Sequence, residues 1–208
     1  MNPKTRIAIL ISGRGSNMLA LSDAIEQGSI PNAEIVLVVS DNARAQGLTV
    51  AEERELNTVV IERRGRPREE HDSEILSALI NHETDLICLA GYMRLLSPGF
   101  VQAFSGRILN IHPSLLPSFP GLDAQAQALE HGAKWSGCTV HFVDDTLDGG
   151  PIIAQRIVPV LDGDSEETLS ARILEQEHKL YPEAVAFIVR GEYEVIGRRV
   201  IVAAPKTD

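Results

Sequence analysis

The segment NIHPS, residues 110–114, contains two side chains that could act on a carbonyl group. Its first three residues continue an apolar run and precede Pro113, so they are expected to end a strand. Residues two apart on a strand project to the same side, which would place Asn110 and His112 together. An Asn amide can donate to a developing oxyanion, and a His ring can transfer a proton near neutral pH. A structural histidine explains the segment equally well at this stage.

The segment DDTLDGGP, residues 144–151, carries a carboxylate in a tight loop. Asp148 precedes two glycines and a proline, a composition that restricts the shape of the loop. Placed near His112, its carboxylate would stabilise the protonated imidazole ring. A plain polar turn is the alternative, since Asp-Gly commonly marks one. A calcium loop beginning at Asp144 does not fit, because its twelfth position is Gln155 instead of Glu.

The segment SGRGSN, residues 12–17, follows an apolar run and begins a helical pattern. Gly13 and Gly15 would let the backbone turn tightly. Ser16 and Asn17 would then start the helix, where free amides and the helix dipole favour an anion such as a phosphate. The spacing is neither that of the dinucleotide-binding glycine motif nor that of a Walker loop. A tight turn with a helix cap remains the alternative.

No metal site or covalent nucleophile is predicted from the motifs. The histidines are not spaced as a metal-binding pair, and the chain has no Cys-x-x-Cys motif. No serine lies in a nucleophile elbow. Cys88 and Cys138 lie in apolar runs and are expected to be buried, reduced thiols on strands. A metal-free, non-covalent transfer is the economical reading.

These segments must be positioned by the elements between them. Strands are expected at 6–12, 34–40, 58–62, 85–90, 107–112, 137–143 and 152–160. Helices are expected near 16–27, 43–56, from Pro67 onward, at 124–131 and at 165–190, where Ser165 is the cap, and a hairpin or edge strand at 193–202.

This alternation predicts an α/β, Rossmann-like, doubly wound and mostly parallel sheet with helices on both faces. Such sheets bind ligands at the carboxyl ends of their strands. Three polar segments are expected there: SGRGSN, GYMRLLSPG and NIHPS.

The composition limits the function further. The chain has 208 residues, 44% of them hydrophobic and 23% charged, which suits one globular domain. A net charge of −10 disfavours nucleic acid as a partner. The N-terminus lacks a signal-peptide pattern, and no apolar run approaches the roughly 20 residues of a membrane helix. A cytoplasmic protein without membrane contacts is therefore expected.

Taken together, the motifs resemble those of the phosphoribosylglycinamide formyltransferase family. The segments ILISGRGSN, LAGYMRLLSP, LNIHPSLLPSFPGL, GCTVHFVDDTLDGGPII and EHKLYP occur in the family's order over about residues 6–182. The resemblance implies a single formyltransferase domain over 1–208, with a phosphate-binding half of about 1–105 and a folate and catalytic half of about 106–208. The implied reaction moves the formyl group of 10-formyltetrahydrofolate to the amine of 5-phosphoribosylglycinamide, a step of de novo purine synthesis. No metal is implied.

The resemblance also implies roles for individual residues. Asn110 and protonated His112 would stabilise the oxyanion, and Asp148 would hold the histidine and help relay a proton. The substrate-binding residues would be Gly15, Ser16 and Asn17 at the phosphate and Glu177 near the amine. The folate-binding residues would be Arg68, Met93, Arg94, Leu95, Leu96, Asn110, Val143, Asp144 and Asp148.

Other readings stay open. A formyltetrahydrofolate deformylase would transfer the formyl group to water, and a non-catalytic folate- or nucleotide-binding module would need the fold without the polar trio. Methionyl-tRNA formyltransferase shares the Asn, His and Asp pattern, but normally carries a further tRNA-binding domain. The chain also departs from many relatives at Asp123 and Gln125, where they carry histidines. The sequence leaves a monomer and a homodimer equally open.

Overall fold

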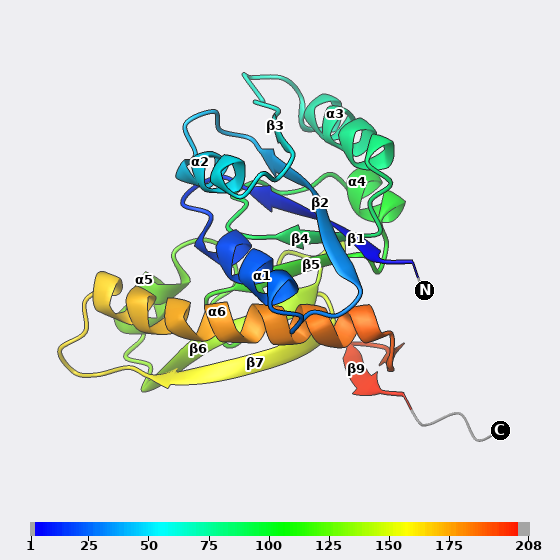
Figure 1. Ribbon diagram of the computed structural model, residues 1–208. Helices are drawn as coiled ribbons and strands as arrows, with labels where there is room; N and C mark the ends of the chain where they lie inside the picture. The colour runs from blue at the N-terminus through cyan, green and yellow to red at the C-terminus, as the bar shows by residue number, and fades with distance from the viewer. Residues whose placement is uncertain (1–2, 204–208) are drawn as a thin grey trace.

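The computed structural model describes residues 3–203, which form a nine-stranded sheet with helices on both faces (Figure 1). The strands are β1 (Thr5–Ile11), β2 (Ala33–Ser40), β3 (Thr58–Val60), β4 (Leu86–Leu89), β5 (Ile108–His112), β6 (Trp135–Phe142), β7 (Ile152–Pro159), β8 (Tyr193–Ile196) and β9 (Arg199–Val202). Their order across the sheet is β3-β2-β1-β4-β5-β6-β7-β9-β8. The first five strands in this order are parallel, whereas β6 runs antiparallel to both of its neighbours.

The helices are α1 (Ser16–Glu26), α2 (Gln46–Glu53), α3 (Arg68–Asn81), α4 (Pro98–Ala103), α5 (Ala124–Glu130) and α6 (Glu166–Arg190). Successive residues of β1 point to opposite faces of the sheet. Ile9 belongs to the core under α1 and α6, whereas Leu10 belongs to the core under α3 and α4. Both faces of the central strands are thus buried, as expected for parallel strands covered by helices.

The predicted fold class is confirmed, and one helix was missed. Helix α4 begins after Ser97, whose side chain accepts a hydrogen bond from the Phe100 amide, and has Pro98 at its first position. With six residues it is too short to show helical periodicity, so only its cap could have revealed it. Pro67 is the N-cap residue of α3 and lies just outside the helix instead of in its first turn.

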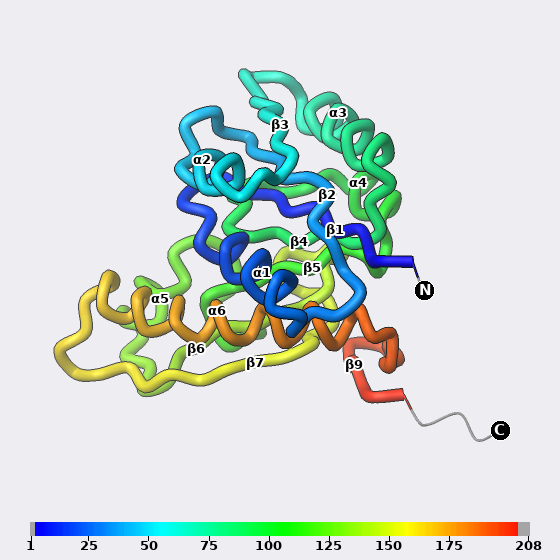
Figure 2. The backbone as a smooth tube through the Cα atoms, in the orientation of Figure 1, coloured from blue at the N-terminus to red at the C-terminus, as the bar shows by residue number. Residues whose placement is uncertain are grey.

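Strand order brings the three predicted ligand segments together at the carboxyl ends of the central strands. β1 lies between β2 and β4, and β4 lies between β1 and β5 (Figure 2). Because β1, β4 and β5 are parallel neighbours, their carboxyl ends meet. The segments after these strands begin at residues 12, 90 and 113.

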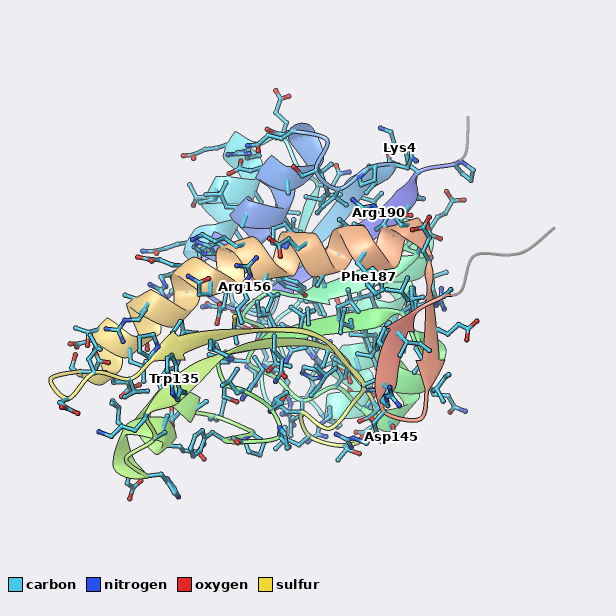
Figure 3. The ribbon with its side chains drawn as sticks, turned by 90° about the horizontal axis from the view of Figure 1, so that it is seen from below. Lys4, Trp135, Asp145, Arg156, Phe187 and Arg190 are labelled. Atoms are coloured by element: carbon cyan, nitrogen blue, oxygen red, sulfur yellow. The ribbon has the colours of Figure 1, made fainter. Side chains whose placement is uncertain are left out.

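The long helix α6 covers β6 and β7 on one face of the sheet (Figure 3). The predicted cap is present: Ser165 and Thr168 form a capping box at its start. Tyr181 in the middle of the helix reaches the carbonyl oxygens of Leu89 and Leu109, at 3.0 and 3.1 Å. This contact fixes α6 against β4 and β5.

The predicted hairpin at the C-terminal end is formed by β8 and β9, with β8 as the edge strand. It lies close to the loop that contains Asp145 (Figure 3). Within residues 3–203, no helix is both long and apolar enough to span a membrane.

Candidate active site

Asn110, His112 and Asp148 are brought together at the carboxyl end of β5. Asn110 and His112 lie on the strand itself, and Asp148 comes from the loop between β6 and β7. His112 Nδ1 is 3.5 Å from Asp148 Oδ2, and both side chains are largely buried. His112 Nε2 lies 2.9 Å from the carbonyl oxygen of Phe119. Both ring nitrogens of His112 therefore face an oxygen atom.

The backbone around Asp148 is closely constrained. Asp148 itself has a φ of 47°, in the left-handed region. A Cβ at Gly150 would lie 1.9 Å from the carbonyl oxygen of Phe142, so only glycine fits there. The Gly121 amide donates a 2.7 Å hydrogen bond to Asp148 Oδ2. The loop thus aims this carboxylate at the end of β5.

His141 on β6 belongs to the same cluster, although the predicted set of site residues did not include it. The antiparallel register places it directly opposite Asn110. Its Nδ1 lies 2.8 Å from the Phe142 carbonyl oxygen, so we infer that the ring hydrogen is on Nδ1. Nε2 can then accept a hydrogen bond from Asn110 Nδ2 at 3.1 Å, and it lies 3.7 Å from Asp148 Oδ1.

Burial lowers the pKa of His141, against the opposing effects of the Phe142 carbonyl and the Asp148 charge. A neutral His141 suits its role as an acceptor. Through this hydrogen bond, His141 orients the Asn110 side chain with Nδ2 toward the imidazole ring. The available signal for this residue was its position on the strand expected at 137–143, where alternate residues face the same side.

The loop before α5 contacts the same cluster. Phe119, Gly121 and Asp123 all have left-handed backbone conformations. Through the Phe119 carbonyl and the Gly121 amide, the loop touches both His112 and Asp148. Phe119 O therefore occupies the acceptor position beside His112 Nε2.

The predicted phosphate segment forms the tight turn into α1. Gly15 has a φ of 74°, and a Cβ there would lie 2.6 Å from the Cα of Gly47. No side chain caps the amides at the start of α1, where Ser16 and Asn17 are the first residues. Uncapped amides at a helix N-terminus can bind an anion.

Glu177 on α6 lies beside this turn. Its Oε2 accepts a 2.7 Å hydrogen bond from Asn17 Nδ2, and both side chains are buried. Burial raises the pKa of Glu177, while the Asn17 hydrogen bond and the charge of Arg14 act in the opposite direction. Asn17 Oδ1 is buried without a hydrogen-bond partner in the described part of the chain. Arg14 is a nearby cation that the predicted set lacked.

The predicted folate residues divide into two groups. Met93 is 68% exposed and Leu95 57% exposed, on the loop after β4. Leu96 and Val143 are partly buried and pack against the same core cluster.

The charged members of the predicted folate set differ in their contacts. Arg94 Nε bonds Asp41 Oδ2 at 2.5 Å, and Asp144 accepts a hydrogen bond from the Thr146 amide. Arg68 is the first residue of α3, and within residues 3–203 no hydrogen bond or ion pair joins it to the other predicted residues.

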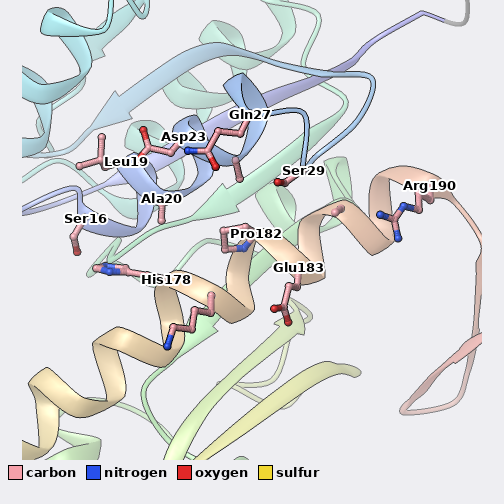
Figure 4. A pocket seen from close by; sticks show the side chains of 13 residues that line it. Ser16, Leu19, Ala20, Asp23, Gln27, Ser29, His178, Pro182, Glu183 and Arg190 are labelled. Atoms are coloured by element: carbon pink, nitrogen blue, oxygen red, sulfur yellow. The ribbon is translucent and has the colours of Figure 1, made fainter.

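A cavity of about 620 Å³ lies between α1 and α6 (Figure 4). Ser16 and His178 lie at one end of it, and Arg190 lies at the other. The cavity therefore adjoins the turn into α1. Asn110, His112 and Asp148 are not among its lining residues.

Neither a metal cluster nor a reactive thiol is found among the described residues. No group of three or more His, Cys, Asp or Glu side chains there is placed to hold a metal ion. Cys88 and Cys138 are free and buried, as predicted. Burial raises the pKa of each thiol to about 12, which disfavours the nucleophilic thiolate.

Comparisons with known proteins agree with this geometry. The formyl transferase family model matches residues 5–185. Phosphoribosylglycinamide formyltransferase of Escherichia coli K12 is 44% identical over 190 residues, which cover 91% of this chain and 89% of that protein. The crystal structure of glycinamide ribonucleotide transformylase 1 from Symbiobacterium toebii matches with a TM-score of 0.95 and 46% identity, covering 98% of this chain and 96% of that one.

A longer relative matches over the same region. The trifunctional purine biosynthetic protein adenosine-3 of Drosophila pseudoobscura pseudoobscura is 50% identical over 191 residues, which cover 91% of this chain. The match spans only 14% of that protein's length. Together, these matches and the clustered polar residues show that the chain belongs to the formyl transferase family and, within it, to the phosphoribosylglycinamide formyltransferases.

Proposed function

We propose that the chain transfers the formyl group of 10-formyltetrahydrofolate to the amine of 5-phosphoribosylglycinamide. The products are formylglycinamide ribonucleotide and tetrahydrofolate, in de novo purine synthesis. The observation that carries the proposal is the grouping of Asn110, His112 and Asp148 at the end of β5. The uncapped turn into α1 follows β1, which only β4 separates from β5 in the sheet. A phosphate would be bound at this turn.

In the proposed reaction, the glycyl nitrogen attacks the formyl carbon and forms the new carbon–nitrogen bond. The bond from that carbon to N10 of the folate then breaks, and the proton lost by the amine is passed to the leaving nitrogen. Asn110 Nδ2 has a second hydrogen beyond the one directed at His141, and it can donate this to the oxyanion. His112 Nε2 would be the second donor, once Phe119 O has moved away.

Asp148 has two tasks in this scheme. Its position 3.5 Å from His112 Nδ1 stabilises the charged ring, and it can take part in the proton relay. Electrostatic stabilisation by donors already held in place is the largest contribution expected of such a site. No covalent intermediate with the enzyme is needed.

The proposed binding residues fall into a group for the phosphorylated amine and a group for the folate. We assign the phosphate to Gly15, Ser16 and Asn17, and the amine end of the substrate to Glu177. The folate would contact Met93 to Leu96, together with Val143 and Asp144. Exposed Met93 and Leu95 beside partly buried Leu96 offer apolar surface for a flat heterocycle. Arg68 is proposed as a cation on the folate side.

A formyl-transfer assay tests the function. Purified protein is mixed with 10-formyltetrahydrofolate, with and without 5-phosphoribosylglycinamide, and the folate absorbance is followed. We expect folate to be consumed only when the amine is present. Equal consumption without the amine would identify a deformylase.

His112→Ala tests the site within the same assay. We expect a loss of about 10²- to 10⁴-fold in rate, with folate binding retained, because a positioned acid–base group contributes on that scale. His82→Ala is the matched control, since His82 follows α3 and, among the described residues, its ring bonds only the Ala78 carbonyl. Native activity in His112→Ala would contradict the catalytic assignment.

A further inference from the structure

Ser12 begins the phosphate segment, residues 12–17, and bonds to the folate segment, residues 91–99, which contains Met93, Arg94, Leu95 and Leu96. Its amide donates to the Gly91 carbonyl at 3.2 Å. Its hydroxyl oxygen accepts a 2.9 Å hydrogen bond from the Met93 amide. The first residue of the phosphate segment therefore holds the start of the folate segment at two points, across 81 residues of sequence.

The turn after β2 also contacts both the phosphate segment and the folate segment. Asn42 Nδ2 donates to the Ser12 carbonyl at 3.2 Å. The neighbouring Asp41 is buried, and its Oδ2 bonds Arg94 of the folate segment at 2.5 Å. All three polar groups of Ser12 are thus used in bonds to neighbouring loops. A displacement of residue 12 would therefore disturb the hydrogen bond that holds the amide of residue 93.

We propose that Ser12 is a positioning residue that couples the phosphate site to the folate site. The inference rests on the proposed function, because it assigns the two ligands to the two segments. An anion bound to the amides after Gly15 would fix the turn that contains Ser12. The Ser12 hydroxyl would then hold Met93, and with it the apolar surface offered to the folate. Coupling of this kind is reciprocal, so each ligand raises the affinity for the other.

The coupling can be measured without turnover. Tetrahydrofolate, which has no formyl group to transfer, is titrated by calorimetry with and without saturating 5-phosphoribosylglycinamide. In the native protein, we expect the amine to lower the Kd of tetrahydrofolate by about fivefold or more, the usual lower bound of such coupling. Ser12→Ala removes the acceptor of the Met93 amide and keeps both backbone bonds.

For Ser12→Ala we expect two changes. The Kd of tetrahydrofolate alone rises by about fivefold, the effect of one lost hydrogen bond. The ratio of Kd values with and without the amine falls to about one. Ser12→Thr, which keeps the hydroxyl, should restore the ratio. Ser77→Ala is the control, because within residues 3–203 that hydroxyl bonds only the Ser73 carbonyl, on the exposed side of α3.

The outcomes separate the two proposals. If neither ligand binds the native protein, the proposed function fails. If both bind natively but with independent Kd values, the function stands and the coupling is wrong. An unchanged ratio in Ser12→Ala would likewise overturn the role of Ser12. Loss of thermal stability with a native ratio would show that the residue is only structural.

Discussion

Gly150→Ala should uncouple Asp148 from the histidines without removing any reacting group. The added Cβ would lie 1.9 Å from the carbonyl oxygen of Phe142, whereas real Cβ atoms essentially never come within 3.0 Å of such an atom. Phe142 is the last residue of buried strand β6, and its amide already bonds Pro151 O at 2.9 Å. The loop must therefore yield instead of the strand.

The size of the effect follows from this overlap. The loop has to move by roughly 1 Å, and Asp148 is only two residues away from the new methyl group. A misplacement of about 1 Å in a catalytic arrangement can cost on the order of 100-fold in rate. Forcing a methyl group into a packed site also costs about 1–3 kcal/mol of stability. We expect losses of this size in kcat and in the free energy of unfolding.

The assay compares kcat, the thermal unfolding midpoint and the Kd of tetrahydrofolate between native and variant proteins. Gly163→Ala is the matched control: a Cβ there meets no atom within 4 Å, and its backbone is not left-handed. We expect this control to keep native activity. A folded Gly150→Ala protein with the native kcat would refute the reasoning, because it would show that the position of Asp148 does not limit the rate.

Two further predictions concern the phosphate turn. Burial raises the pKa of Glu177 above 4.5, so its contribution to stability is complete below that pH and is lost as the pH rises through the folded value. Glu177→Gln should therefore unfold at a higher temperature than the native protein at pH 7, yet bind the phosphorylated amine more weakly; calorimetry measures both, and a lower unfolding temperature would count against the argument. Gly15→Ala should raise the KM for the amine by about tenfold or more, since a Cβ would strike Gly47 in addition to the strain of a left-handed backbone. Gly28→Ala has the same φ of 74° and open space around its Cβ, so equal KM values in the two variants would exclude the close contact as the cause.

Local sequence signals were sufficient for most of the elements. Strand β1, expected at 6–12, is found at Thr5–Ile11, and helix α6, expected at 165–190, is found at Glu166–Arg190. Apolar periodicity and the Ser165 cap depend only on residues nearby in the chain, so the sequence alone reports them. The short helix α4 was missed, because six residues are too few to show helical periodicity.

The candidate residues and the pairing of His112 with Asp148 were predicted from the sequence, whereas the other contacts of these residues were not. The motifs named Asn110, His112 and Asp148, and their catalytic roles stay predictions. The orientation of Asn110 depends on His141, which lies opposite it only through the register of β5 and β6. Contact between the Phe119 carbonyl and His112 also has no signature in the sequence.

The amino-acid sequence by itself determined which segments are strands and helices and which segments carry the polar groups. Only the tertiary structure decided which of these groups meet. Asn17 and Glu177 are bonded across 160 residues, and Ser12 and Met93 across 81. Such pairs depend on strand order and register, which are set by packing both faces of the whole sheet at once. No local pattern encodes that packing, because each apolar strand could pair with several others before the two cores are filled.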